Sequence, residues 1–203
     1  MSDKFAIFIL THGRSDNVVT YKTLRSQGYT GEIILLIDDE DKEADNYKKI
    51  YGNQVHTFNK QDAIDMTDSG DNFQKRNSVV YARNYNFKVA EKLGIKYFLQ
   101  LDDDYSQFRY TFDNDDNYIT KSISIKDLDG VIKCMLDFYI DSNVTTIAMS
   151  QGGDFIGGEG SGVATKYKKG EFSRKAMNSF FCSTDRPFKF VSTSKPSIKV
   201  VLS

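Results

Sequence analysis

The 203-residue sequence is poor in the residue types that build disulfide frameworks and zinc sites. It holds two cysteines, Cys134 and Cys182, which lie far apart and outside any Cys-x-x-Cys pair. We expect both to be buried free thiols in a reducing compartment, because free cysteine packs as a small apolar side chain. The two histidines, His12 and His56, are too few and too distant in sequence to predict a zinc site. These absences argue against a disulfide scaffold and against a zinc-centred domain.

Long apolar runs are also absent. No stretch approaches the ~20 consecutive apolar residues that a membrane-spanning helix needs. The chain opens on the polar residues Met1–Lys4, and the apolar run Phe5–Leu10 is too short for the core of a signal peptide. We therefore expect a cytoplasmic protein without a membrane partner. With 39% apolar and 27% charged residues, the composition is that of one globular domain, residues 1–203, with a full hydrophobic core.

Net charge is small, at −1, but it is unevenly distributed. Residues 164–203 contain nine basic and two acidic residues, a balance of +7, which leaves −8 on residues 1–163. Such a segment indicates either a surface for a polyanionic partner or a solvated basic face. Its most closely spaced basic residues are Lys166, Lys168, Lys169, Arg174 and Lys175.

The first half of the chain alternates short apolar runs with segments of helical spacing. Strands are predicted at 5–10, 32–37, 54–58 and 97–101, and helices at 15–28, 42–51 and 78–93. This alternation predicts an α/β fold with a mainly parallel sheet flanked by helices. Residues 59–77 are polar and lack periodicity, which is typical of a functional or mobile loop.

Beyond residue 105 the pattern is looser and suggests mixed or antiparallel strands. Strands are predicted at 119–125, 144–149, 178–182 and 188–191, and a helix at 128–140. The glycine-rich segment 151–162 is not a P-loop, because no Gly-Lys-Ser/Thr follows, and not a Rossmann fingerprint, because no clear helix follows. We interpret it as a lid or acceptor-site loop hinged at glycines, or as a plain disordered loop.

Ligands of open α/β sheets bind beyond the carboxyl ends of the strands. Three predicted strands deliver polar residues to that edge: Thr11, His12 and Arg14, then Asp38 and Asp39, then Asp102, Asp103 and Asp104. Three consecutive carboxylates repel one another unless a cation lies among them, and oxygen ligands favour Mg²⁺ or Mn²⁺. Side-chain alternation places Asp102 and Asp104 on one side as the metal pair. A helix cap or a solvated acidic turn is the alternative.

Arg83 lies inside the helix predicted at 78–93. A guanidinium there could bind a diphosphate bidentately, or it could pair with a nearby carboxylate and order the acidic run. The two interpretations are compatible.

The order of four motifs along the chain resembles that of the GT-A glycosyltransferases. These motifs are Thr-His-Gly-Arg after the first strand, Asp-Asp after the second, Ala-Arg-Asn in the helix at 78–93 and Leu-Gln-Leu-Asp-Asp-Asp-Tyr at the last parallel strand. Over roughly residues 5–190 the chain is more narrowly similar to the TET-associated and phage glycosyltransferases that decorate 5-hydroxymethylpyrimidines in DNA. The resemblance implies a GT-A-like (Rossmann-like) fold with a donor half, 1–105, and an acceptor half, 106–203. It also implies a nucleotide-sugar donor such as a UDP-sugar, Mn²⁺ or Mg²⁺ as cofactor, and 5-hydroxymethylcytosine in phage DNA as acceptor.

The resemblance further assigns roles to residues. Thr11, His12, Arg14 and Asp103 would border the donor, Asp38 or Asp39 would contact its base or ribose, Arg83 would lie near the diphosphate, and Asp102 and Asp104 would hold the metal. The basic residues between 166 and 175 would contact DNA.

An inverting enzyme of this kind needs a general base beside the acceptor hydroxyl. The tail, residues 192–203, has no carboxylate, so the candidates are the late acids Asp154, Glu159 and Asp185. Two other functions stay open: a non-catalytic module that retains donor binding, which the tail favours, and a sugar nucleotidyltransferase. The short loop Thr11–Arg14 lacks the glycine-rich basic signature that nucleotidyltransferases usually carry.

Overall fold

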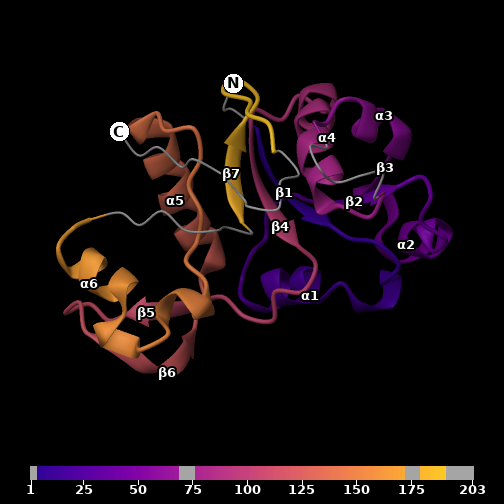
Figure 1. Ribbon diagram of the computed structural model, residues 1–203. Coiled ribbons are helices and arrows are strands. Elements are labelled where there is room, and N and C mark those ends of the chain that lie inside the picture. Colours follow the sequence, from indigo (N-terminus) through magenta and orange to yellow (C-terminus); the bar gives the residue numbers. More distant parts are fainter. Residues whose placement is uncertain (1–3, 69–75, 172–178, 191–203) are drawn as a thin grey trace.

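The computed structural model describes residues 4–68, 76–171 and 179–190. Its centre is a five-stranded sheet in the order β3-β2-β1-β4-β7 (Figure 1). The parallel strands are β1 (Phe5–Leu10), β2 (Ile33–Asp38), β3 (Val55–Phe58) and β4 (Tyr97–Asp102), and β7 (Phe180–Ser183) pairs antiparallel with β4. The predicted fold class is confirmed: the sheet is mainly parallel, helices flank it, and its antiparallel strand comes from the second half of the chain.

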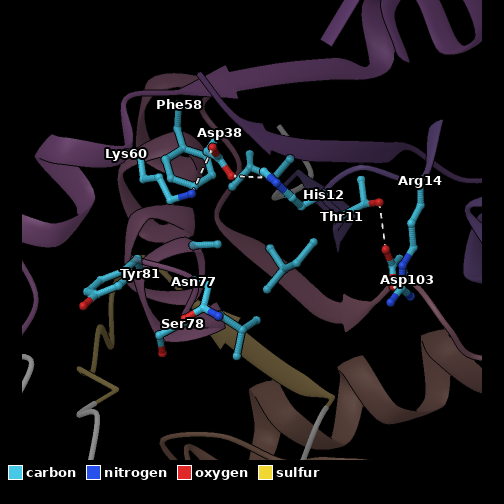
Figure 2. A pocket seen from close by; sticks show the side chains of 14 residues that line it. Thr11, His12, Arg14, Asp38, Phe58, Lys60, Asn77, Ser78, Tyr81 and Asp103 are labelled. Atoms are coloured by element: carbon cyan, nitrogen blue, oxygen red, sulfur yellow. Dashed lines mark hydrogen bonds and ion pairs between the residues drawn. The ribbon is translucent and has the colours of Figure 1, made fainter. Parts of the chain in front are cut away.

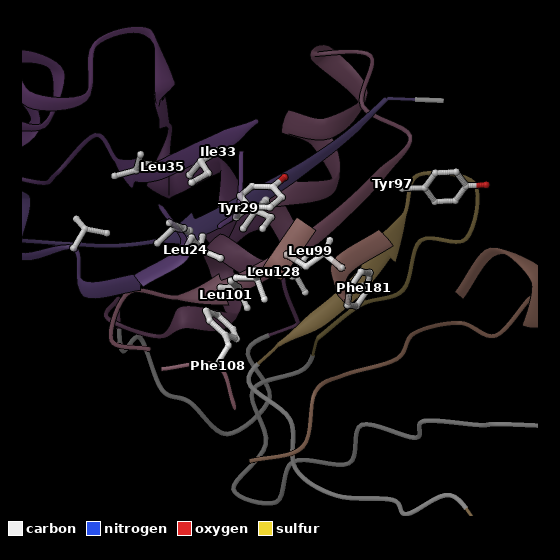
Figure 3. Packing of buried hydrophobic residues seen from close by; sticks show 14 of the residues in the cluster. Leu24, Tyr29, Ile33, Leu35, Tyr97, Leu99, Leu101, Phe108, Leu128 and Phe181 are labelled. Atoms are coloured by element: carbon white, nitrogen blue, oxygen red, sulfur yellow. The ribbon is translucent and has the colours of Figure 1, made fainter. Parts of the chain in front are cut away.

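Continuous apolar strands form the centre because both faces of the sheet are covered. In β1, Ile7 and Ile9 belong to one buried cluster, whereas Ala6, Phe8 and Leu10 belong to the other. The first cluster packs against α1 (Val19–Ser26) and α5 (Leu128–Ser142), as Leu24 and Leu128 show in Figure 3. The second packs against α3 (Lys60–Asp65) and α4 (Val79–Lys92). A one-residue slip would exchange the two faces, so the register is strongly determined.

Helix boundaries depart from the predictions where side chains make alternative caps. The segment expected to open the first helix is a 3-10 turn, η1 (Ser15–Asn17), because the backbone N–H and hydroxyl of Ser15 both donate to Glu43. Helix α2 (Ala44–Tyr51) follows, and a short turn, η2 (Gly52–Gln54), leads into β3. The loop predicted at 59–77 contains α3, whose first turn Asn59 caps by accepting the N–H of Asp62.

Part of the second half, residues 109–124 and 152–168, forms a group beside the sheet. A two-stranded hairpin of β5 (Arg109–Phe112) and β6 (Tyr118–Ser124) lies next to α6 (Gly162–Lys168), at the lower left of Figure 1. Strand β5 was not predicted. The glycine-rich segment forms two 3-10 turns, η3 (Gly152–Phe155) and η4 (Gly158–Gly160), and leads into α6. The expectation that no helix follows it was therefore wrong.

Two further strand predictions were wrong, and residues 144–149 show why. They run as irregular chain alongside β7, where the hydroxyl of Thr146 donates to the Phe181 carbonyl and the Phe181 N–H donates to Ile147. One side chain thus replaces part of a strand ladder. Residues 188–190 are likewise not a strand, and the rest of that predicted segment lies outside the described residues.

The two cysteines differ in environment. Cys182 is buried in β7, as expected, and burial raises the pKa of its thiol. Cys134 is exposed on α5, so its predicted burial was wrong, because it lies on the side of that helix turned away from Leu128 and Ile132. No helix within the described residues is long and apolar enough to cross a bilayer.

Candidate functional site

The acidic run at the end of β4 is fixed by one residue of α1. The buried Thr20 donates its hydroxyl to the carbonyl of Asp102 at 2.6 Å and accepts the N–H of Tyr105 at 2.8 Å. Its own N–H donates to the carbonyl of Asp103. The backbone of the three aspartates is therefore held in place independently of any ligand.

Asp102 is paired with Arg83. One terminal nitrogen of Arg83 donates to both carboxylate oxygens, at 2.8 and 3.1 Å, and the guanidinium lies 5.0 Å from the ring centre of Phe180. Burial raises the pKa of Asp102, and the charge and hydrogen bonds of Arg83 oppose that shift. Of the two interpretations of Arg83, the structure shows the carboxylate pair. Arg83 lines neither of the two cavities described below, and its place near a donor diphosphate stays a prediction.

Asp103 and Asp104 face different surroundings. The carboxylate of Asp103 accepts from the hydroxyl of Thr11 at 2.8 Å and from Arg14 at 3.0 Å. Asp104 is exposed and makes no hydrogen bond or ion pair to any described residue. Arg83 and Arg14 therefore place one guanidinium each beside Asp102 and Asp103. In the described part of the chain, no three metal-binding side chains converge on one point.

The first cavity lies at the carboxyl ends of the parallel strands and has a volume of about 260 Å³. Strands β1, β2 and β3 contribute to its wall, as do Asp103, directly after β4, and the beginning of α4 (Figure 2). Its polar lining residues are Thr11, His12, Arg14, Asp38, Lys60, Asn77, Ser78 and Asp103. The structure thus brings together most of the residues predicted for donor binding.

A buried carboxylate organises this cavity. Asp38 is 7% exposed, accepts from Nδ1 of His12 at 2.8 Å and pairs with Nζ of Lys60 at 3.3 Å. The three side chains form a row in Figure 2, joined by dashed lines. Of the two aspartates predicted to contact base or ribose, only Asp38 lines the cavity. Asp39 is exposed and accepts from the side chain of Asn59 and the N–H of Lys60, so it caps the start of α3 instead.

Other lining residues come from positions that the sequence had left unassigned. Lys60 lies in the segment predicted to be a loop, and Phe58, at the end of β3, forms an aromatic wall. Ser78 caps α4 through the N–H of Val80, so the positive end of that helix dipole borders the cavity. The rule that ligands bind at carboxyl ends of strands could have identified Phe58, because β3 was predicted to end there.

A second, larger cavity of about 640 Å³ begins at Asp104 and extends along β5. Residues 104–112, α5 and residues 148–151 form most of its wall, together with Phe155 and Tyr167. The two cavities meet the acidic run from opposite sides, because Asp103 lines the first and Asp104 the second. This agrees with the predicted alternation of side chains.

The three candidate bases are unequal. Asp154 lies in sequence between Gln151 and Phe155, which line the second cavity, and its carboxylate accepts the N–H of Gln151. Glu159 is paired with Lys168. Asp185 pairs with Lys96, before the start of β4, whereas Asp102 ends that strand. Because β7 is antiparallel, it carries Asp185 to the opposite edge of the sheet from the acidic run.

The basic residues predicted to contact DNA fall partly on α6. Lys166, Lys168 and Lys169 are exposed at its C-terminal end, and Tyr167 between them lines the second cavity. Arg174 and Lys175 lie outside the described residues, as does the carboxylate-free tail.

Known proteins resemble this chain in sequence and, distantly, in fold. A model of the TET-associated glycosyltransferase family matches residues 5–197. Among solved structures, the chain is similar to S. aureus TarS 1-349 in complex with UDP-GlcNAc, with 12% identity and a TM-score of 0.38. That likeness covers 75% of this chain and 38% of the TarS chain, and it is too distant to bear on the site. No curated protein matches. Because the family match spans nearly the whole sequence, the chain belongs to the TET-associated glycosyltransferase family.

Proposed function

We propose that this chain transfers a sugar from a nucleotide sugar, bound in the first cavity, to a hydroxyl acceptor that enters from the second. The single observation that carries the proposal is the placement of Asp103 and Asp104. Consecutive residues of one rigid backbone line both cavities, so a donor and an acceptor would meet at the acidic run. Catalysis by positioning requires such a shared boundary.

The first cavity suits the nucleotide part of the donor, for which we propose UDP. The Asp38 carboxylate accepts hydrogen bonds, Phe58 offers an aromatic wall, and Thr11 and His12 line the same space. Lys60, Arg14 and the positive end of α4 supply the positive potential that a diphosphate needs. The family match supports a sugar nucleotide over a free nucleotide.

A divalent cation, Mg²⁺ or Mn²⁺, is part of the proposal. Asp104 offers a carboxylate with no competing partner among the described residues, and Asp102 keeps lone pairs beyond those that Arg83 uses. Such oxygen ligands fit an ion that completes its coordination with water and donor phosphates rather than a closed protein cage. When bound, the cation would stabilise negative charge on the departing nucleoside diphosphate.

The reaction forms one bond and breaks another. The acceptor oxygen attacks the anomeric carbon, the bond from that carbon to the β-phosphate oxygen breaks, and the nucleoside diphosphate leaves with the electron pair. The hydroxyl proton passes to a carboxylate, for which Asp154 is our candidate because its neighbours Gln151 and Phe155 line the second cavity. Arg14 and Thr11 hold Asp103 in place at the boundary.

For the acceptor we propose 5-hydroxymethylcytosine in DNA, as in a phage genome. The exposed lysines of α6 flank the second cavity and could neutralise backbone phosphates. Because Lys168 pairs with Glu159, Lys166 and Lys169 are the more available cations.

Transfer is tested directly by mass spectrometry. Duplex DNA that contains 5-hydroxymethylcytosine is incubated with the protein, Mn²⁺ and a panel of nucleotide sugars, and the DNA is digested to nucleosides. We expect one donor to add one sugar mass to the modified nucleoside, and we expect EDTA or Asp104→Asn to suppress the addition. Donor binding without any transfer would instead identify a non-catalytic binding module.

A further inference from the structure

The second cavity has an aromatic wall that carries an unoccupied ring. Tyr110 on β5 lines the cavity, is 44% exposed and contacts no other described ring. The neighbouring aromatics are engaged with one another: Tyr105 stacks on Phe108, and Phe112 stacks on Tyr167 with centroids 4.0 Å apart. Tyr110 is therefore an aromatic face held within an ordered aromatic wall and left free for a ligand.

The same cavity has polar groups that lack partners. The hydroxyl of Tyr105 and the side-chain nitrogen of Gln151 are buried and have no hydrogen-bond partner. The side-chain oxygen of Gln151 is occupied, because it accepts the N–H of Asp154 in the η3 capping box. Leaving a buried donor unpaired is unfavourable, so such groups usually have a partner in the functional state. Both residues belong to the wall of one cavity, so one ligand with hydrogen-bond acceptors could satisfy both donors.

We propose that the second cavity receives the acceptor base as an unpaired ring, displaced from its duplex, which stacks on Tyr110 and accepts hydrogen bonds from Tyr105 and Gln151. This proposal rests on the proposed function, because the base would belong to the nucleotide whose hydroxymethyl group is glycosylated. A stack needs only a planar ring, whereas two donors require a ring that bears carbonyl or ring-nitrogen acceptors, as a pyrimidine does.

Position and size support a base at this site rather than an intact duplex edge. The cavity begins at Asp104, so a ring on Tyr110 lies on the acceptor side of the acidic run. Its volume of about 640 Å³ is in the range of small-molecule sites. An enzyme that takes a base out of the stack must offset the loss of stacking and pairing, and an aromatic platform does so.

If the base is displaced from the duplex, the protein should prefer DNA in which that base is not paired. Recognition of the base edge within an intact duplex predicts no such preference. Unpairing is least unfavourable for a mismatched or single-stranded base. The test measures binding of fluorescent oligonucleotides with one 5-hydroxymethylcytosine, paired with guanine, mismatched with adenine or single-stranded, at fixed salt. We expect wild-type protein to bind the mismatched and single-stranded forms more tightly. Tyr110→Ala should weaken binding of these two forms by roughly 5- to 150-fold, the range of one base–aromatic stack, and should remove the preference.

Phe138 on α5 offers a matched control. It is an aromatic side chain that is also 44% exposed, and it does not line the cavity, so Phe138→Ala should keep wild-type binding and preference. Equal wild-type affinity for paired and mismatched DNA, including no binding of either, would overturn the proposal, as would a preference that survives Tyr110→Ala. Thermal stabilisation by UDP-sugar and Mn²⁺ is measured in the same samples. If that stabilisation persists while the preference is absent, only the base site is wrong; if both are absent, the proposed function fails as well.

Discussion

The pair between Arg83 and Asp102 should be worth more to stability than its exposed counterparts, and one variant tests this. In Arg83→Met the apolar length is kept, but the Asp102 carboxylate loses hydrogen bonds of 2.8 and 3.1 Å. Removing one partner of a buried pair costs about 3–5 kcal/mol. We expect the lower end, about 3 kcal/mol, because the Asp102 side chain keeps 27% of its surface exposed while Arg83 keeps 9%. For a chain of this size that corresponds to a melting temperature roughly 6–12 °C lower.

Acid should reduce the loss of stability that Arg83→Met causes. Burial raises the pKa of Asp102 above its ordinary 3.8, and Arg83 opposes the shift, so Arg83→Met raises that pKa further. A carboxyl whose pKa is higher in the folded than in the unfolded state destabilises the native state at pH values where it is ionised. That destabilisation disappears as pH falls and the carboxyl becomes protonated in the folded protein. The difference in free energy of unfolding between Arg83→Met and wild type should therefore become smaller as pH falls towards 3.8. Urea denaturation at several pH values measures it.

A double variant separates the pair from simple loss of packing. Arg83→Met with Asp102→Asn removes both charges, and it also removes the buried Nε of Arg83, which has no partner. Replacing a buried pair by neutral groups is often neutral, so most of the lost stability should return. If the double variant is destabilised by the sum of the two single changes, the pair contributes no coupling and the reasoning is wrong.

Three further predictions concern single positions. Tyr105→Phe should leave the free energy of unfolding unchanged or raise it by up to about 1 kcal/mol, because the Tyr105 hydroxyl lacks a partner. Tyr139→Phe should lower it by about 1 kcal/mol, because it removes a 3.0 Å hydrogen bond to the Thr145 carbonyl. Equal losses of stability for the two variants in urea denaturation would contradict this. Asp185→Asn should leave sugar transfer at the wild-type rate, and a large loss of that rate would identify Asp185 as the base. Hydrogen bonds from Ser15 lower the pKa of Glu43 below its ordinary 4.5, so its contribution to stability is present above that pH and lost as pH falls. Glu43→Gln should flatten the acid limb of the stability curve, and an unchanged limb would count against this bond.

The parallel sheet and its functional edge could be predicted because their signals are local. Strands such as Phe5–Leu10 are continuous apolar runs, and strand ends map directly to one edge of an α/β sheet. Asp38 and Asp103 were placed at the first cavity by that rule, and the structure agrees.

What could not be predicted depends on contacts between distant residues. Arg83 meets Asp102 only because α4 folds over β4, so sequence alone could not choose between a carboxylate and a diphosphate as its partner. Asp185 looked like a late acidic residue, but the direction of β7 carries it away from the site. The second cavity joins residues from 104 to 179, which no local pattern links.

The most direct test of the account is calorimetric titration of UDP, with Mn²⁺ present, into wild type, Lys60→Met and Lys49→Met. Lys60 lines the first cavity, whereas Lys49 is an exposed lysine of α2 that does not. A hydrogen bond to a charged group contributes about 1.5–3 kcal/mol, so Lys60→Met should weaken UDP binding roughly 10- to 150-fold. Lys49→Met should bind as wild type does, and EDTA should weaken binding to all three. Equal affinities for the two lysine variants, or no binding of UDP to wild type, would contradict the claim that this cavity holds the donor.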